Sequence, residues 1–256
     1  MIETWSEGDA DEHMSEAILV ELAGLVEAHP WWRARSRLTL ELLDRCGVRR
    51  GQRVLDVGCG WGVTLTALES AGFSADGLDI SRGAMERIDR PDRRLIVADL
   101  TKPIPDVDGY DAVLALDVLE HLDDDRAAAA VLGRLVAPGG RVVVSVPALP
   151  ALYSEFDAVQ GHRRRYTEPM LRSVFDDSNL EIEHMFWWGQ WMVPLLRMRP
   201  KTKSGDSPMV VYRRHLRLPP APVRAGLRLA YRLEHRLALA GRLRTGTSLF
   251  AVARCR

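Results

Sequence analysis

The sequence predicts an α/β fold in which a mostly parallel sheet is covered by helices on both faces. Short apolar segments alternate with amphipathic helical segments, and the apolar segments have no polar face. Such strands are typical of parallel sheets that are buried on both sides. Parallel sheets of this kind bind ligands beyond the carboxyl ends of their strands. We therefore expect the loops after residues 57, 79, 99 and 116 to share one cleft.

The predicted elements follow a regular order. Residues 12–28 and 31–46 have apolar residues at three- and four-residue steps, which predicts two helices before the first strand. Strands are expected over residues 53–57, 75–80, 94–99, 110–116, 141–146, 180–188 and 247–255. Helices are expected over residues 64–71, after Ser81, and over residues 123–136, 167–177 and 221–244.

This order divides the chain into four segments. Residues 1–50 form a helical cover, residues 51–188 form the ligand-binding core, residues 189–246 form a basic helical insertion, and residues 247–256 supply the last strand. About 57 residues separate the sixth predicted strand from the last, which is too many for a hairpin. The position of the last strand therefore does not follow from periodicity.

Composition and charge exclude several classes of protein. The chain has 256 residues, 46% of them apolar, and no net charge, which argues against disorder. Residues 197–256 nevertheless hold 15 Lys and Arg against 2 Asp and Glu, so the other residues carry a net charge of −13. An acidic body argues against nucleic acid as a partner, whereas the basic segment favours an anionic partner or a membrane surface. The acidic start, the lack of a long apolar run and three scattered cysteines predict a cytoplasmic protein.

The segment VLDVGCGWG, residues 54–62, points to a ligand. It lacks the Gly-Lys-Ser/Thr of a phosphate-binding loop, and Val63 stands where a dinucleotide fingerprint has its third glycine. Asp56 lies immediately before the turn, where its charge would repel a pyrophosphate. A ligand that carries an ammonium group suits this carboxylate better.

Two further acids end the next strands. Asp79 ends the second strand, where a carboxylate can accept hydrogen bonds from both hydroxyls of a ribose. Asp99 ends the third, where it can accept one from an adenine amine. Together with Asp56, these positions indicate an adenosine joined to a cationic amino acid.

The segments VLDVGCGWG, GLDIS, VADL, YDAVLALDVLEHL and LVAPGGRVVVSVP follow in order over residues 53–147. In this order the chain resembles the class I S-adenosylmethionine (SAM)-dependent methyltransferases of the Rossmann-like type. The resemblance implies a seven-stranded sheet whose last strand is antiparallel and inserts beside the sixth. It also implies SAM as the cofactor, with S-adenosylhomocysteine (SAH) as the product. The cofactor-binding residues that it implies are Asp56, Gly58, Cys59, Gly60, Asp79, Ile80, Asp99, Leu100, Asp117 and Val118.

Residues 117–121 follow the fourth strand, and in similar enzymes this segment lies under the sulfonium and faces the acceptor. His121 is a candidate catalytic residue, with capping or packing as the alternative. No Asn/Asp-Pro-Pro-Tyr motif is present, which argues against the methyltransferases of adenine or glutamine. Glu120, His121 and His162 could share a metal ion, but their spacing is not diagnostic, so no metal ligand is assigned and metal use stays open.

Residues 151–167 resemble a narrower set of these enzymes with a Gly-His-Arg-Arg-Arg-Tyr-Thr-like segment. His162 is a candidate base because a histidine titrates near neutral pH. The alternative is a hydrogen-bonded loop in which His162, Asp157 and the arginines serve only structure. Candidates for contact with the acceptor are Tyr153, Asp157 and Arg163, together with Trp188 of the Trp-rich run 186–191.

Residues 29–38, HPWWRARSRL, resemble the helix that covers the cofactor in the same narrower set. There an arginine can pair with the SAM carboxylate, and Arg33 and Arg35 are the candidates, with Arg35 preferred. Trp32 is a candidate cofactor contact, although Trp31 and Trp32 can instead pack the helix onto the sheet.

The predicted helix 221–244 has two rows of side chains at four-residue spacing: Arg224, Arg228, Arg232 and Arg236, and beside them Leu229, Leu233 and Leu237. One interpretation is a peripheral helix that contacts anionic lipid. The other, which we prefer from the sequence, is a lid or homodimer helix whose leucines pack on protein.

These observations predict a SAM-dependent methyltransferase that acts on an O or N nucleophile of a small molecule, such as a specialised metabolite. One alternative is an isoprenoid or lipid-linked acceptor at the membrane surface. Another is a SAM-binding scaffold without catalytic activity.

Overall fold

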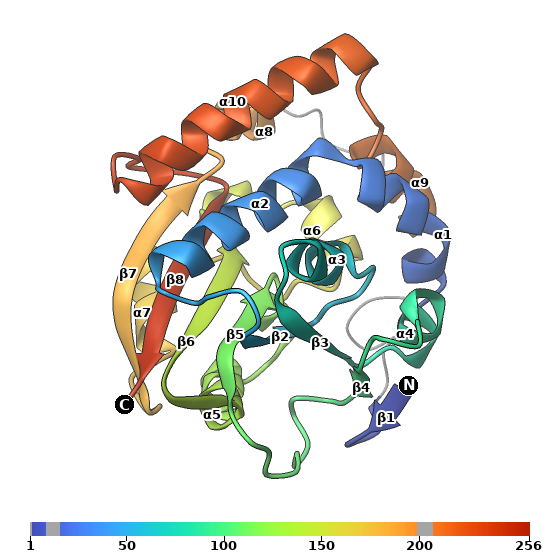
Figure 1. Ribbon diagram of the computed structural model, residues 1–256. Coiled ribbons are helices and arrows are strands. Elements are labelled where there is room, and N and C mark those ends of the chain that lie inside the picture. Colours follow the sequence, from blue (N-terminus) through green and yellow to red (C-terminus); the bar gives the residue numbers. More distant parts are fainter. Residues whose placement is uncertain (1, 9–15, 199–206) are drawn as a thin grey trace.

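The computed structural model describes residues 2–8, 16–198 and 207–256, and an eight-stranded sheet lies at its centre (Figure 1). The strand order is β1-β4-β3-β2-β5-β6-β8-β7. Neighbouring strands are parallel except around β8, which runs antiparallel to both β6 and β7. The strands are β1 (Ile2–Thr4), β2 (Arg53–Val57), β3 (Ser74–Asp79), β4 (Leu95–Val97), β5 (Tyr110–Leu116), β6 (Val136–Pro147), β7 (Leu180–Trp188) and β8 (Ser248–Cys255).

The sheet confirms the predicted fold class, including the antiparallel last strand inserted beside the sixth predicted strand. It has one strand more than the seven expected, because Ile2–Thr4 pairs in parallel with β4. Three residues are too few to show a period in the sequence. The first 50 residues therefore contribute an edge strand as well as helices.

Helices cover both faces of the sheet (Figure 1). Leu55 and Val57 of β2 belong to the hydrophobic cluster that includes Leu132 of α5, whereas Val54 belongs to the opposite cluster with Leu38 of α2. The helices are α1 (Glu16–Ala28), α2 (Pro30–Arg45), α3 (Val63–Ser70), α4 (Arg82–Ile88), α5 (Asp125–Leu135), α6 (Glu155–Val159), α7 (Glu168–Ser173), α8 (Met192–Arg197), α9 (Pro208–His215) and α10 (Ala221–Leu239).

Several predicted boundaries were wrong. The helix predicted over 221–244 ends at Leu239, because Gly241 adopts a left-handed backbone with φ of 64° and closes the helix. The strand predicted over 94–99 ends at Val97, since its partner β3 ends opposite it at Asp79. Residues 12–15 of the first predicted helix lie outside the described residues.

The second helix begins one residue earlier than predicted. Pro30 occupies its first turn, where proline's missing N–H costs nothing, and the His29 ring nitrogen Nδ1 accepts a hydrogen bond from Trp31 N at 3.3 Å. This start fixes the direction of α2, which carries Trp32 and Arg35 to the ligand side of the sheet.

Candidate functional site

The loops after β2, β3, β4 and β5 share one cavity of about 580 Å³, as predicted. Each loop contributes residues to its wall, because parallel strands end at the same edge of the sheet. The predicted cofactor residues that line it are Trp32, Arg35, Asp56, Gly58, Cys59, Gly60, Asp79, Ile80, Asp99, Leu100, Asp117 and Val118. The structure therefore brings together the complete predicted cofactor set.

The glycine turn needs residues without side chains. Gly58 and Gly60 have φ angles of 68° and 44°, in the left-handed region, and a Cβ on Gly58 would lie 2.5 Å from Val118 Cγ2. Gly60 N donates a hydrogen bond to Asp79 Oδ2 at 2.8 Å, and Ser81 N donates to Asp79 Oδ1 at 2.9 Å. Asp79 thus holds the turn in place while it faces the cavity.

Asp56 is buried at the base of the cavity, with 3% of its surface exposed. Burial raises the pKa of its carboxyl group to about 7, opposed by the positive charge of Arg35 and reinforced by the negative charge of Asp79. A cationic group placed beside Asp56 would favour the ionised carboxylate, as the sequence analysis expected for an ammonium ligand.

Arg35 reaches the cavity from α2. Its guanidinium forms an ion pair with the Asp117 carboxylate, and its Cζ lies 5.0 Å from the centre of the Trp31 ring. Its buried Nε has no hydrogen-bond partner among the described residues. Arg33, in contrast, is exposed and donates to Glu27 O at 2.7 Å. Arg35 therefore has a donor left for an anionic group in the cavity.

Asp117 occupies a strained position after β5. Its φ is 59°, which non-glycine residues adopt rarely, and its Oδ1 accepts a hydrogen bond from Ser145 Oγ at 3.1 Å. The ion pair with Arg35 and the bond from Ser145 together hold this backbone, which turns the following residues into the cavity.

Ser6 and Gly8 of the N-terminal segment contact residues at the end of the cavity near β4. Ser6 Oγ accepts a hydrogen bond from Asp99 N at 2.9 Å, and a Cβ on Gly8 would lie 2.7 Å from both Asp99 Oδ2 and Ile80 Cδ1. Asp99 Oδ1 accepts two bonds from Thr101. Residues 6–8 therefore pack beside Asp99 and Ile80.

At the other end of the cavity, His162 is paired with a buried carboxylate. Its Nδ1 lies 3.2 Å from Asp157 Oδ1, and Arg165 Nε donates to the same oxygen at 2.7 Å. Although burial opposes ionisation, the bonds from His162 and Arg165 lower the pKa of Asp157 to about 2. An ionised Asp157 favours the proton on Nδ1, which leaves Nε2 as a proton acceptor.

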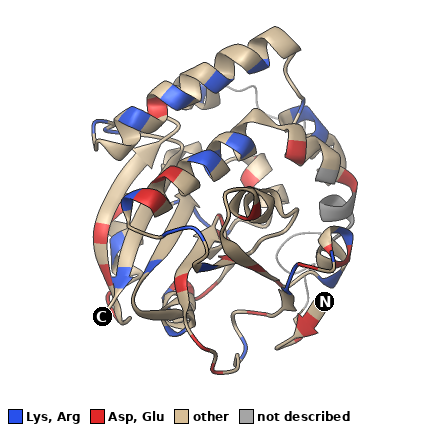
Figure 2. Ribbon diagram, viewed as in Figure 1, with Lys and Arg blue, Asp and Glu red and all other residues tan. Residues whose placement is uncertain are grey.

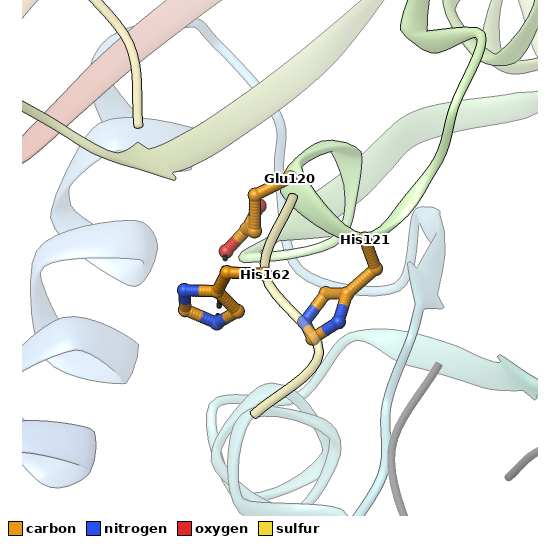
Figure 3. A group of neighbouring side chains, drawn as sticks. All are labelled: Glu120, His121 and His162. Carbon is orange, nitrogen blue, oxygen red and sulfur yellow. Dashed lines mark ion pairs between the residues drawn. The ribbon is translucent and has the colours of Figure 1, made fainter. Parts of the chain in front are cut away.

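His162 belongs to a buried group with Glu120 and His121 (Figure 3). One ligand atom from each residue lies within 4.8 Å of the others, and His162 Nε2 is 3.9 Å from Glu120 Oε1. Both Glu120 oxygens lack a hydrogen-bond partner among the described residues. Burial and the nearby Asp117 raise the pKa of Glu120 well above its ordinary value. These three side chains have the donor atoms to hold a divalent ion.

The predicted acceptor contacts lie around this cavity, outside its described lining. Tyr153 donates from its hydroxyl to His162 O at 2.7 Å, and Arg163 pairs with Asp123 at 2.7 Å. Trp188 is fully buried in the hydrophobic core. Asp157 does not line the cavity itself but contacts His162, which does. Contact of these four residues with an acceptor stays a prediction.

The Trp-rich run and the helical insertion were expected to form the acceptor wall, but most of the individual residues beside His162 were not predicted. Trp191 of the Trp-rich run lines the cavity, and it is joined by side chains of the helical insertion: Met192, Leu195 and Leu196 of α8, and Leu227 and Tyr231 of α10. The six residues of α8 give too little periodicity to place its side chains, and the period of α10 does not say which of its faces meets the cavity.

The structure contradicts the lid half of the preferred interpretation of α10, whereas the homodimer half stays a prediction. Leu229, Leu233 and Leu237 are exposed, whereas Tyr231 and Ala238 pack against the core. The leucine row therefore does not pack on this chain. None of the helices in the described ranges is long and apolar enough to cross a membrane.

Comparison with known proteins gives the same fold. A family model described as a methyltransferase domain matches residues 31–185. The ubiquinone biosynthesis O-methyltransferase of Alkalilimnicola ehrlichii is 33% identical over 118 residues, which cover 42% of this chain and 47% of that relative. The matches span 47% to 64% of the length of the first three curated relatives.

Solved structures are similar over more of the chain. One is the complex between the Haloferax volcanii Trm112 methyltransferase activator and a methyltransferase, with 20% identity, a TM-score of 0.56, and coverage of 98% of this chain and 99% of that one. Another is the geranyl diphosphate C-methyltransferase of Streptomyces coelicolor, with 15% identity, a TM-score of 0.53, and coverage of 84% and 74%. At these identities the similarity shows the fold.

Proposed function

This chain belongs to the class I SAM-dependent methyltransferases, and we propose that it transfers the methyl group of SAM to an oxygen atom of a small-molecule acceptor. The observation that carries the proposal is the Asp157–His162 pair, because His162 lines the cavity that the strand-end carboxylates share and its Nδ1 is held by Asp157. A base of this kind serves a hydroxyl acceptor, which must lose a proton. The O-methyltransferase names of its relatives support oxygen over nitrogen.

In this proposal SAM lies across the strand ends. Asp99 accepts from the adenine amine, Asp79 accepts from the ribose hydroxyls, and Asp56 binds the ammonium group. The orphan Nε of Arg35 donates to the SAM carboxylate. Asp117 and Val118 would hold the part of SAM that carries the sulfonium, and His121 and His162 line the same cavity on the acceptor side.

The reaction is an in-line displacement at carbon. The acceptor oxygen attacks the methyl carbon, the carbon–sulfur bond breaks, and its electron pair stays on sulfur to give SAH. The hydroxyl proton moves to His162 Nε2, and the ionised Asp157 stabilises the imidazolium that forms. Because the sulfonium is already a good leaving group, the other residues act mainly by alignment and by exclusion of water.

The test is incubation of the purified protein with methyl-labelled SAM and an extract of its source cells, followed by partition between water and organic solvent. The proposal predicts label in a small molecule as an ether, which resists mild alkali. An amine-linked label would contradict the choice of oxygen. No transferred label, with SAM shown to bind, would favour the scaffold alternative.

An isoprenoid or lipid-linked acceptor is the second candidate. Leu195 supports it, because this side chain lines the cavity and is also 57% exposed, so the apolar rim reaches the surface. Label that partitions with membrane lipids would favour this candidate. In either case we propose a cytoplasmic setting, in which Cys46, Cys59 and Cys255 remain thiols.

A further inference from the structure

The outer surface of α8 and α10 has an unusual combination of side chains. Six of the nine exposed large apolar side chains in the described part of the chain lie on these two helices or directly after α8. They are Leu195 and Met198 at the end of α8, and Val223, Leu229, Leu233 and Leu237 of α10. On α10 the three leucines recur every four residues, so they form one continuous apolar row.

A row of arginines lies beside the leucines. Arg228, Arg232 and Arg236 are exposed, and Figure 2 shows the basic residues along the length of α10. Glu234 is the one acidic residue within the sequences of α8 and α10, and it is buried, where its Oε1 accepts from Gln190 N at 2.7 Å. The outer surface of α10 is therefore apolar along one side and cationic along the other.

We propose that this surface, formed by the exposed apolar side chains of α8 and α10 and the arginine row of α10, binds the anionic surface of a phospholipid bilayer. The helix would lie in the plane of the interface, with its leucines at the acyl boundary and its arginines among the lipid phosphates. The inner residues Tyr231, His235 and Ala238 keep the helix on the protein. The arginine row of α10 complements the negative charge of such a bilayer.

The charge pattern disfavours a second copy of the chain. Two α10 helices packed against each other would gather eight arginines, with no exposed acidic side chain on either helix to balance them. A bilayer supplies the missing negative charge and also accepts the leucines. Leu195, at the rim of the cavity, lies on α8, whose Met192 contacts Tyr231 of α10, so binding would bring the cavity mouth near the lipid. This proposal concerns where the enzyme works and does not depend on the acceptor.

The test is co-sedimentation of the full chain with phosphatidylcholine vesicles, with and without about a third of phosphatidylglycerol. We expect binding that needs the anionic lipid and weakens with salt. Changing Arg228, Arg232 and Arg236 together to Gln should weaken binding about a hundredfold, and changing Leu229, Leu233 and Leu237 together to Ser should weaken it at least tenfold. Because these side chains are exposed, both variants should keep the far-ultraviolet circular dichroism of the parent.

The matched control changes Arg87, Arg126 and Arg134 to Gln, which removes the same charge from exposed positions on α4 and α5. It should bind vesicles within about threefold of the parent. The proposal would be overturned if the parent did not bind, or if the control lost as much affinity as the α10 variants. A dimer in sedimentation velocity that the leucine variant abolishes, without vesicle binding by the parent, would assign the surface to a second copy instead.

Discussion

The two ends of the cavity are built differently. At the cofactor end, Asp56, Asp79 and Asp99 lie at the carboxyl ends of three neighbouring strands, and the sheet fixes their positions. At the acceptor end, His162 comes from the loop between α6 and α7, and Leu195 and Leu227 come from helices outside the sheet. The first end depends on backbone geometry and the second on side-chain packing. Mutations at the two ends should therefore affect different steps.

The largest effect is expected at the cofactor end. Asp79→Ala should weaken SAM binding about a thousandfold, because it removes two charge-assisted acceptors for the ribose and leaves Gly60 N without its partner. Isothermal titration calorimetry measures this affinity. Asp76→Ala is the control, since Asp76 lies on the same strand and pairs with Arg94 away from the cavity. Equal losses in both variants would contradict a specific role for Asp79.

At the acceptor end, His162→Ala should lower kcat about 10²- to 10³-fold and leave SAM affinity within threefold, because the base acts only on the acceptor. Initial rates with the identified acceptor measure kcat. His184→Ala removes an exposed histidine of β7 and should have no effect. An unchanged kcat in the His162 variant would reduce this residue to a structural role.

Asp157, the partner of His162, should make the free energy of unfolding depend on pH. The pKa of Asp157 is lowered from 3.8 to about 2, so its contribution of about 2 kcal/mol is present above pH 4 and is lost as the pH falls toward 2. Urea unfolding of the parent and of Asp157→Asn between pH 2 and 5 should show the two curves converging at low pH. Curves that stay parallel would show that Asp157 is not ionised by its partners.

Asp56 gives a second dependence on pH, in the affinity for SAM. Since burial raises its pKa to about 7, SAM affinity should rise about tenfold between pH 5.5 and 7, as the carboxylate that binds the ammonium ionises. For the same reason the free protein should lose stability as the pH rises from about 4 to 7. Asp56→Asn should abolish the rise in affinity, and a rise of the same size in this variant would contradict the assignment.

Removal of metal should have the smallest effect. Because we assign His162 Nε2 to proton transfer, dialysis against a chelator should change the rate less than twofold. Loss of activity that a divalent ion restores would instead make Glu120, His121 and His162 a metal site.

The same contrast explains what could be predicted from sequence. Asp56, Asp79 and Asp99 could be predicted to lie together because parallel strands end at a common edge. Gly58 could be predicted to lie in the turn because a side chain there would clash with Val118. The position of Trp191 in the wall and of Trp188 in the core could not be predicted, since both belong to one aromatic run. Packing between distant segments decides which ring faces the cavity.

The exposed leucines of α10 show a related limit of prediction from sequence. Their four-residue spacing predicted a helix, and the sequence alone favoured packing of this row on protein. Glu234, His235 and Ala238 are the side chains that turn inward instead. Periodicity finds the faces of a helix, but which face is buried depends on the surface that receives it.

The central claim is that SAM at the strand ends and an acceptor at His162 meet in one cavity. A crystal structure with SAH tests it most directly. We predict the ribose hydroxyls on Asp79, the amino acid carboxylate on Arg35 Nε, and the sulfur directed toward His162 and Glu120. Binding of SAH with its sulfur turned away from His162, or with its ribose elsewhere than at Asp79, would contradict the account.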